Sequence, residues 1–309
     1  TRSCAIVEKL MTNFRAAEGR HASPGEERAW QSSLQYVANA LDDAALPADA
    51  GVAVEYQIPS CSKRVDVLLS GYDEALRPNL VVIELKQWSE SAVTDEDGIL
   101  AAPRHGAALI PGPHPSYQAW SYAELLRNFN TECAPSSERS AVQVRPCAYL
   151  HNYPAEGAEQ NVLDPRYAEY LNAAPVFLGG PREQKHLKSF LKRFLVKGDR
   201  GRTIEIVENG EIRPSKALAD SIAGMIRGNR EFVLIDEQKT IFEHVRSLVL
   251  QRSRLDPKKR VVIVKGGPGT GKSVVAVNLL AALTAKQKLC CYVSKNAAPR
   301  AVYSAKLSG

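Results

Sequence analysis

Three kinds of feature are missing from this chain of 309 residues, and each absence argues against a class of protein. Its six cysteines include no Cys-x-x-Cys pair, so the sequence offers neither a zinc-binding pattern nor the frame of a disulfide-rich secreted domain. No apolar run approaches the roughly 18 residues that a membrane-spanning helix needs, and no signal-peptide pattern is visible. Internal repeats and low-complexity segments are absent too. We therefore expect a cytoplasmic protein with reduced thiols.

The composition is that of a globular protein of about two domains. Charged residues make up 24% and hydrophobic residues 44% of the chain, which are ordinary fractions. The formal net charge of +6 is compatible with a polyanionic partner such as nucleic acid, although it does not require one.

Two carboxylates and a lysine lie on neighbouring strand-like runs. These runs flank residues 71–78, which are rich in turn formers. If the runs pair as an antiparallel hairpin, Asp66 falls opposite Ile83 or Glu84. Glu84 and Lys86 are two residues apart, so they project from the same face of their strand. The pattern predicts two acids and an amine together at one edge of a sheet.

This set of groups suits the hydrolysis of a phosphodiester. Carboxylates are the ligands that Mg²⁺ prefers, and a bound Mg²⁺ lowers the pKa of its water. A neighbouring amine can orient that water or stabilise developing negative charge. An ordinary hairpin with two solvated acids and an edge lysine explains the same residues equally well.

Two helical segments add further polar groups. Residues 26–41 have an apolar stripe with helical spacing, and Glu26 and Glu27 each lie about 50° from its centre, on opposite flanks. Periodicity does not choose between these two acids. Downstream, Gln118 and Tyr122 are four residues apart, so they lie one above the other on a helix.

In this order, the helix acid, the Asp, the Glu-x-Lys and the Gln-x-x-x-Tyr resemble the PD-(D/E)XK nuclease superfamily. The last motif resembles its RecB-like branch. The resemblance covers roughly residues 20–125 and implies roles in metal-dependent cleavage. It implies Glu27, Asp66 and Glu84 as ligands of Mg²⁺ or Mn²⁺, Lys86 as the amine that orients water, and Gln118 and Tyr122 as supporting contacts to the substrate.

Two details of the motif qualify this resemblance. Glu27 is preferred to Glu26 because the family acid stands three residues before a tryptophan, here Trp30. Val65 occupies the position before Asp66, where the family often has a proline. That proline is a loose element of the motif, so the departure weakens the resemblance little.

Residues 266–273, with the sequence GGPGTGKS, match the P-loop pattern in full. A strand-like run, residues 260–265, precedes them, and a helical run, residues 273–283, follows. Such a loop wraps phosphates with backbone N–H groups, while its lysine reaches the β and γ oxygens and its serine holds Mg²⁺. The predicted nucleotide contacts are Gly266, Gly267, Gly269, Thr270, Gly271, Lys272 and Ser273.

The segments around the P-loop resemble superfamily 1 helicases. Gln238, in residues 234–238, resembles the glutamine that reads adenine, and residues 289–296 resemble the next helicase strand and its nucleic-acid-contacting turn. Residues 232–309 as a whole resemble the start of a Schlafen-group-3-like DNA/RNA helicase. The resemblance implies ATP with Mg²⁺ as cofactor and nucleic acid as partner. DNA is favoured over RNA, but the sequence does not decide between them.

No aspartate or glutamate occurs between residues 274 and 309. ATP hydrolysis in this class needs an acid on a later strand to complete the Mg²⁺ shell. We therefore expect the chain to be the N-terminal part of a longer protein. We expect it to bind ATP weakly and not to hydrolyse ATP at a useful rate.

The predicted fold class is α/β, in three parts. Residues 1–200 form a nuclease-like domain with a restriction-endonuclease-like mixed sheet flanked by helices, 201–231 a connector, and 232–309 the first part of a RecA-like P-loop domain with a parallel sheet. Within the first part we expect a long loop over residues 88–116 and a strand over 142–150. Pro146 should place that strand at an edge or a bulge.

These features predict a metal-dependent nuclease coupled to a helicase-like ATPase that acts on nucleic acid. Such fusions resemble bacterial restriction and phage-defence proteins. One alternative is a nuclease-like fold that only binds nucleic acid and recruits the motor. A second alternative is a nucleotide-dependent regulatory switch that binds a protein partner.

Overall fold

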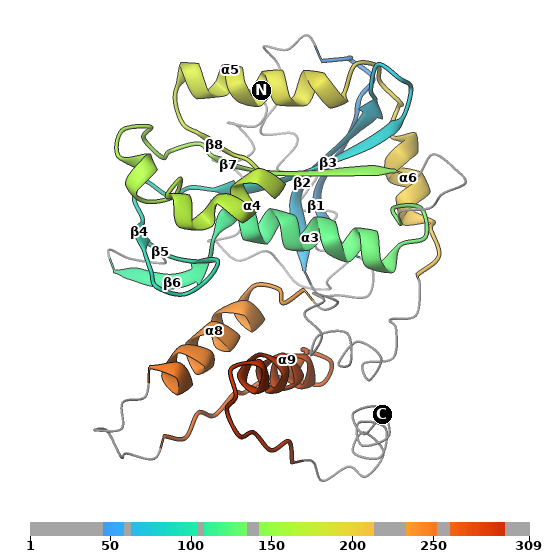
Figure 1. The fold of residues 1–309 in the computed structure, drawn as a ribbon. Helices are drawn as coiled ribbons and strands as arrows, with labels where there is room; N and C mark the ends of the chain where they lie inside the picture. Colours follow the sequence, from blue (N-terminus) through green and yellow to red (C-terminus); the bar gives the residue numbers. More distant parts are fainter. Residues whose placement is uncertain are drawn as a thin grey trace. The chain divides into compact units, whose positions relative to one another are not determined.

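The computed structural model describes residues 46–58, 63–103, 108–134, 142–212, 233–251 and 260–293. The chain divides into two compact units (Figure 1). The first unit comprises residues 1–91 and 115–212, and the second comprises residues 92–114 and 213–309. The helix expected over residues 26–41 lies outside the described residues, and so do the two glutamates on it.

The first unit is built on a five-stranded mixed sheet with the strand order β1-β2-β3-β7-β8. β1 to β3 are antiparallel neighbours, β7 runs parallel to β3, and β8 runs parallel to β7. The expected hairpin and mixed sheet are therefore confirmed. The strands are β1 (Gly51–Gln57), β2 (Arg64–Tyr72), β3 (Pro78–Lys86), β7 (Gln143–Leu150) and β8 (Val176–Leu178).

The helix α5 (Pro181–Phe194) covers one face of this sheet (Figure 1). Its buried residues are Leu187 and Leu191, and they pack against Val67 and Ile83. Successive residues of a strand point to opposite faces of the sheet, so the residues next to Val67 and Ile83 point to the other face.

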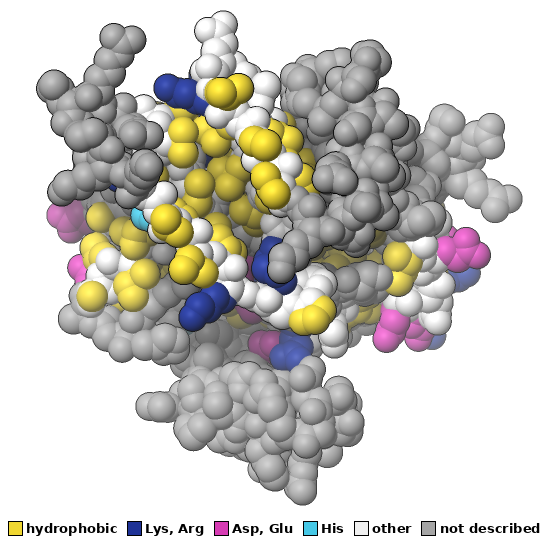
Figure 2. All heavy atoms as spheres, turned by 90° about the horizontal axis from the view of Figure 1, so that it is seen from below, with side chains coloured by type: hydrophobic (Ala, Val, Ile, Leu, Met, Phe, Trp, Pro, Cys, Tyr) yellow, Lys and Arg dark blue, Asp and Glu magenta, His cyan; other side chains and the backbone are white. Residues whose placement is uncertain are grey.

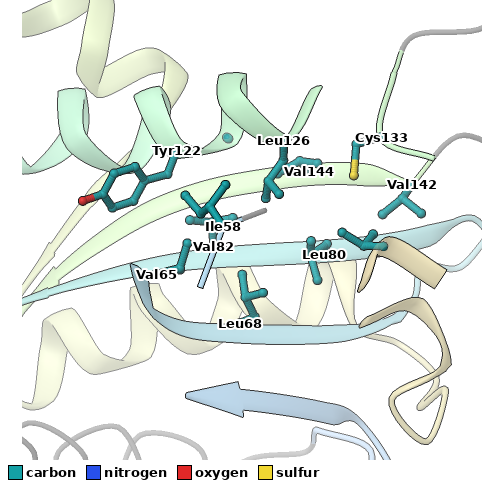
Figure 3. Close-up of a cluster of buried hydrophobic side chains, with 12 residues drawn as sticks. Ile58, Val65, Leu68, Leu80, Val82, Tyr122, Leu126, Cys133, Val142 and Val144 are labelled. Carbon is teal, nitrogen blue, oxygen red and sulfur yellow. The ribbon is translucent and has the colours of Figure 1, made fainter. Parts of the chain in front are cut away.

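The helices α3 (Pro115–Phe129) and α6 (Arg202–Glu208) cover the opposite face. The apolar cluster beneath them (Figure 3) contains Leu80 and Val82 of β3 and Tyr122 of α3. A central sheet covered on both faces explains why β2 and β3 read as nearly continuous apolar runs.

One buried carboxylate ties α6 to the first two strands. Asp199, which is 8% exposed, accepts hydrogen bonds from Gly51 N at 3.2 Å and from the Ser70 hydroxyl at 2.9 Å. It also accepts bonds from the backbone N atoms of Gly201 and Thr203, both at 2.9 Å, at the start of α6. A side chain at residue 51 would not fit, because its Cβ would lie 2.6 Å from the Gly201 Cα. The close approach of helix and strand therefore needs both the glycine and the carboxylate.

The second unit contains a small antiparallel sheet and two helices. The sheet has the order β4-β5-β6, with β4 (Ala92–Val93), β5 (Ile99–Pro103) and β6 (Leu109–Pro113). The long loop expected over residues 88–116 is therefore wrong. The strands are too short to show the alternation of apolar and polar residues that marks a strand in the sequence. Their three prolines lie at the end of β5 and on the edge strand β6, where the missing N–H costs no hydrogen bond between strands.

The helices of this unit are α8 (Glu237–Leu250) and α9 (Lys272–Ala285). They pack together through Leu234, Phe242 and Val275. The helix expected after the P-loop is thus confirmed. No helix within the described ranges is long and apolar enough to cross a membrane, and the cytoplasmic location stays a prediction.

The two strands expected on either side of the P-loop helix do not form. Residues 260–265 and 289–293 are irregular, with Val261 at 85% and Ile263 at 76% exposure. Figure 2 shows apolar side chains gathered on the surface seen from below. A parallel strand exists only by pairing with a neighbour, and the described part of the second unit supplies none for either segment. The expected RecA-like parallel sheet is therefore not formed within the described residues.

The anchoring carboxylate gives a prediction about stability. Burial opposes the ionisation of Asp199, but hydrogen bonds from Thr203, Gly201 and Ser70 outweigh it and lower its pKa below the ordinary value. A lowered folded-state pKa gives stability that is present above about pH 4 and is lost as the pH falls through the folded-state pKa. Asp199→Asn should therefore lower the free energy of unfolding by about 1.5–3 kcal/mol at pH 7. The difference from the unchanged protein should shrink towards pH 3.

Urea unfolding followed by tryptophan fluorescence measures this difference, because Trp88 and Trp120 lie in the first unit. Glu159→Gln is the control, since Glu159 is an exposed carboxylate on the short helix η1 (Ala158–Gln160). A difference between Asp199→Asn and the unchanged protein that is equal at pH 7 and pH 3 would contradict the role of the ionised carboxylate.

Candidate functional site

The end of the β2–β3 hairpin brings the two predicted acids together. The last recorded pair of this ladder is Val67 with Ile83. The ladder ends at this pair, so it does not choose between Ile83 and Glu84 as the residue opposite Asp66. Glu84 and Lys86 are two residues apart on β3, so they share one face of the strand.

Short polar contacts hold the three side chains in place. The Lys86 Nζ lies 2.6 Å from the Glu84 Oε1, and Glu84 is only 2% exposed. The Asp66 Oδ2 accepts a hydrogen bond of 2.6 Å from the backbone N of Leu85, the residue between the other two. The Lys86 ammonium also lies 5.7 Å from the centroid of the Trp88 ring, a cation–π contact. The structure thus unites Asp66, Glu84 and Lys86 at one end of the sheet.

The predicted pair on α3 lies over the same face. The Gln118 Nε2 donates to the Tyr122 hydroxyl at 3.1 Å, which confirms the helical stacking of these two side chains. Tyr122 is 3% exposed and packs with Val82, the residue two positions before Glu84 on β3. Figure 3 shows the Tyr122 hydroxyl pointing away from the rest of the apolar cluster. The phenol is a core residue with a polar end, and its contact with a substrate stays a prediction.

The donor set at this end of the sheet fits part of a metal site. Asp66 and Glu84 supply carboxylate oxygens, the donors that Mg²⁺ and Mn²⁺ prefer. Among the described residues, no group of three or more His, Cys, Asp or Glu side chains is arranged to hold a metal ion. The third predicted ligand, Glu27, lies outside the described residues.

The P-loop of the second unit closes around its own lysine. The Lys272 Nζ donates to the Gly266 O at 2.8 Å and to the Gly267 O at 2.5 Å. Gly269 and Gly271 have φ values of 72° and 81°, a left-handed backbone that glycine adopts without strain. The loop leads directly into α9, so the free N–H groups at the start of this helix face the loop.

Gln238 links the start of α8 to this loop. Its Nε2 donates to the Thr270 O at 3.1 Å, and its Oε1 accepts from the Ile235 N at 3.2 Å. The structure therefore brings together the predicted adenine-reading glutamine and the predicted phosphate loop, 32 positions apart in sequence.

An ion-pair network that the sequence analysis missed fixes α8 to the small sheet. The Lys239 Nζ lies 2.9 Å from both the Asp97 Oδ2 and the Glu243 Oε1, and Arg246 pairs with Glu243 at 2.7 Å. Lys239 and Glu243 are 5% and 3% exposed. Their i, i+4 spacing was visible in the sequence, but Asp97 is more than 140 positions away. This network is one reason why residues 92–114 belong to the second unit.

One comparison with known proteins gives a match. Residues 259–309 match the family model described as "Schlafen group 3, DNA/RNA helicase domain". Searches of curated proteins and of solved structures found no match. The matched segment includes the whole P-loop and lies within the second unit. The second unit therefore carries a helicase-like segment, which points to a nucleic-acid-related ATPase.

Proposed function

We propose that this chain couples two activities on nucleic acid, a metal-dependent nuclease in the first unit and a helicase-like ATPase in the second. The observation that carries the nuclease is the gathering of Asp66, Glu84 and Lys86 at the end of β2 and β3. The helicase-domain match across the P-loop supports the ATPase.

The burial of the acid–lysine group supports a functional role for it. Removing a carboxylate and an ammonium from water carries a desolvation cost that their mutual attraction often does not recover. An apolar pair would serve a purely structural hairpin end at least as well. Glu84 is nevertheless 2% exposed, and the Lys86 side chain is 19% exposed. Charged groups placed at such a cost are candidates for a functional site.

In the proposed site, Asp66 and Glu84, with Glu27, would hold Mg²⁺ or Mn²⁺. The bound ion supplies a water of lowered pKa and neutralises charge on the phosphoryl oxygens. The Leu85 N–H fixes one oxygen of Asp66, so this carboxylate is oriented before any ligand arrives. Lys86 would direct its ammonium towards the attacking water or the developing negative charge. Gln118 and Tyr122 would support the substrate from α3.

In the nucleotide site, Lys272 now donates to the carbonyls of its own loop. An incoming triphosphate would take over these bonds, since its charged oxygens are stronger acceptors. The Gln238 amide lies against the Thr270 carbonyl and would read the adenine from there. Nucleic acid, DNA rather than RNA, is the proposed partner of both units.

The first test concerns cleavage. Asp66→Ala, Glu84→Gln and Lys86→Ala should each lower the rate of divalent-metal-dependent cleavage of labelled DNA by about 10²-fold or more. Glu84→Gln is preferred to alanine because it keeps the volume of a buried side chain beside Lys86. The measurement is the initial cleavage rate with Mg²⁺ or Mn²⁺, on single- and double-stranded DNA and RNA.

Glu159→Ala removes an exposed acid of the same unit and should leave the rate unchanged. Thermal unfolding of each variant shows whether a loss of rate reflects unfolding. Comparison of Glu26→Ala with Glu27→Ala identifies the helix acid that joins the site. Full cleavage by folded Asp66→Ala and Glu84→Gln proteins would refute the nuclease assignment. Binding of nucleic acid without cleavage by the unchanged protein would favour a recruiting module instead.

The second test concerns ATP. Lys272→Ala removes charge-assisted hydrogen bonds and should weaken ATP binding about 10- to 100-fold. Gln238→Ala should weaken it less, and should reduce any preference for ATP over GTP if the glutamine reads adenine. Isothermal titration with each nucleotide gives the affinities.

Lys265→Ala is the matched control, because this exposed lysine directly precedes the P-loop without belonging to it. Equal losses in Lys265→Ala and Lys272→Ala would show that general charge, and not the P-loop, attracts the nucleotide.

A further inference from the structure

A cavity of about 780 Å³ lies in the first unit, and its lining is rich in arginine. Its walls come from the β2–β3 turn, the end of α3, the edge of β7, the segment before β8 and the last turn of α5. We name it the arginine pocket after the four guanidinium groups that line it, those of Arg77, Arg127, Arg145 and Arg193. Its volume is within the range of small-molecule sites.

The pocket exists because β8 is short. β8 pairs with β7 only from Ala148 onward, so the first half of β7 has β3 on one side and the cavity on the other. The backbone N–H of Ala148 points to the β8 side, where it donates to the Pro175 carbonyl. Backbone N–H groups of successive residues point to alternate sides of a strand, so the N position of residue 146 is on the same side as that of residue 148. The missing N–H of Pro146 therefore faces the cavity, where it costs no ladder bond. The edge strand or bulge expected from Pro146 is therefore wrong, because β7 lies between β3 and β8 and pairs with β3 without interruption.

Two of the four arginines are already neutralised. The Arg77 Nε lies 2.8 Å from the Asp73 carboxylate. Arg127 pairs with Glu124 at 2.5 Å and also donates to the Val144 carbonyl. These two arginines brace the turn and the strand that form the walls.

The other two arginines have no carboxylate partner among the described residues. Arg145 makes long contacts of 3.4 and 3.5 Å with the neutral side chains of Asn79 and Gln143. Its guanidinium lies 4.8 Å from the Phe194 ring centroid, and that of Arg193 lies 5.4 Å from the same centroid. Stacking on a ring leaves the N–H edges of a guanidinium available to a ligand.

The electrostatics of the pocket favour an anion. Burial lowers the pKa of Arg145, and the nearby charges of Arg127, Arg77 and Arg193 lower it further. Asp73 offsets part of this repulsion, and the lining contains one other acid, Glu74. The Arg145 guanidinium thus carries its charge close to three other guanidinium groups, and a ligand with two negative charges would relieve that repulsion.

A helix-end effect explains only one of these residues. Arg193 lies in the last turn of α5, where the helix dipole favours a cation. That effect does not account for Arg145 on β7 or for the cavity between them. The exposed residues Lys185 and Lys192 extend the positive charge along α5.

The pocket is separate from the candidate nuclease site. Arg77 directly precedes β3, whereas Glu84 and Lys86 lie at its far end. At about 3.3 Å per residue, the two ends of this strand are roughly 25 Å apart. The pocket also shares no lining residue with the acid–lysine group.

We propose that the arginine pocket binds a phosphate group, carried by a nucleotide or by a nucleic-acid strand, with Arg145 and Arg193 as its principal contacts. Arginine forks suit phosphate because two parallel N–H groups can meet two of its oxygens. The exposed Lys185 and Lys192 of α5 would follow the phosphates of a strand that enters the pocket.

The test measures binding to the full chain in EDTA, so that cleavage does not interfere, and in a Lys272→Ala background, so that the P-loop does not contribute. The probe is a 3′-fluorescein-labelled oligo(dT) of twelve nucleotides with a 5′-phosphate or a 5′-hydroxyl, followed by fluorescence anisotropy. dTMP, thymidine and inorganic phosphate serve as competitors. Arg193→Gln and Arg145→Gln should each weaken binding about 10-fold.

Arg182→Gln is the matched control, because it removes an exposed arginine from the other end of α5, away from the pocket. Competition by dTMP but not thymidine supports the proposal, with a free nucleotide or a strand end as ligand. If both oligonucleotides bind, dTMP does not compete and the pocket variants still weaken binding, the proposal is supported with the internal phosphates of a strand as ligand. Equal losses in Arg182→Gln and Arg193→Gln, or no loss in Arg193→Gln, would overturn it. Arg193 is exposed, so its substitution tests the pocket even if Arg145→Gln fails to fold.

Discussion

The register between β2 and β3 is the constraint on which the first unit depends. Val67 opposite Ile83 places one set of apolar residues under α5 and the alternate set under α3 and α6. A slip of one residue would exchange the two faces of β3, because side chains alternate along a strand. The same slip would move Glu84 and Lys86 away from Asp66. Packing of the core and assembly of the candidate site are therefore enforced by one set of hydrogen bonds.

Charge in this unit is placed around the sheet and not within it. The acids and Lys86 occupy the end of β3, the arginine pocket lies at its start, and Asp199 fixes α6 beside β1. Between these points the central strands are almost wholly apolar and buried. The two charged ends have opposite uses in our proposals, since carboxylates hold a metal ion and guanidinium groups hold phosphate. A nucleic acid would meet both kinds of group on one domain.

The described part of the second unit shows a local motif that forms where no parallel sheet surrounds it. The P-loop turn needs only two left-handed glycines, a lysine that closes the loop and a helix that starts behind it. All of these are short-range features, and Gln238 and the network around Lys239 hold α8 nearby. A parallel sheet needs several strands at once, so Val261 and Ile263 remain exposed although their sequence is that of a buried strand.

The sequence by itself determined the features whose causes are local. Strand and helix periods of two and 3.6 residues, together with turn residues, account for the hairpin, the apolar stripe of α5, the stacking of Gln118 on Tyr122 and the P-loop helix.

Tertiary structure alone decided the features that depend on partners distant in the sequence. Three short strands replaced an expected loop in residues 92–113 because they pair with one another, and Asp97 is tied to α8 by Lys239. The four arginines of the pocket come from four separate elements, and no spacing in the sequence relates them. Only folding brings such groups together, since chain distance carries no information about which charges share a cavity.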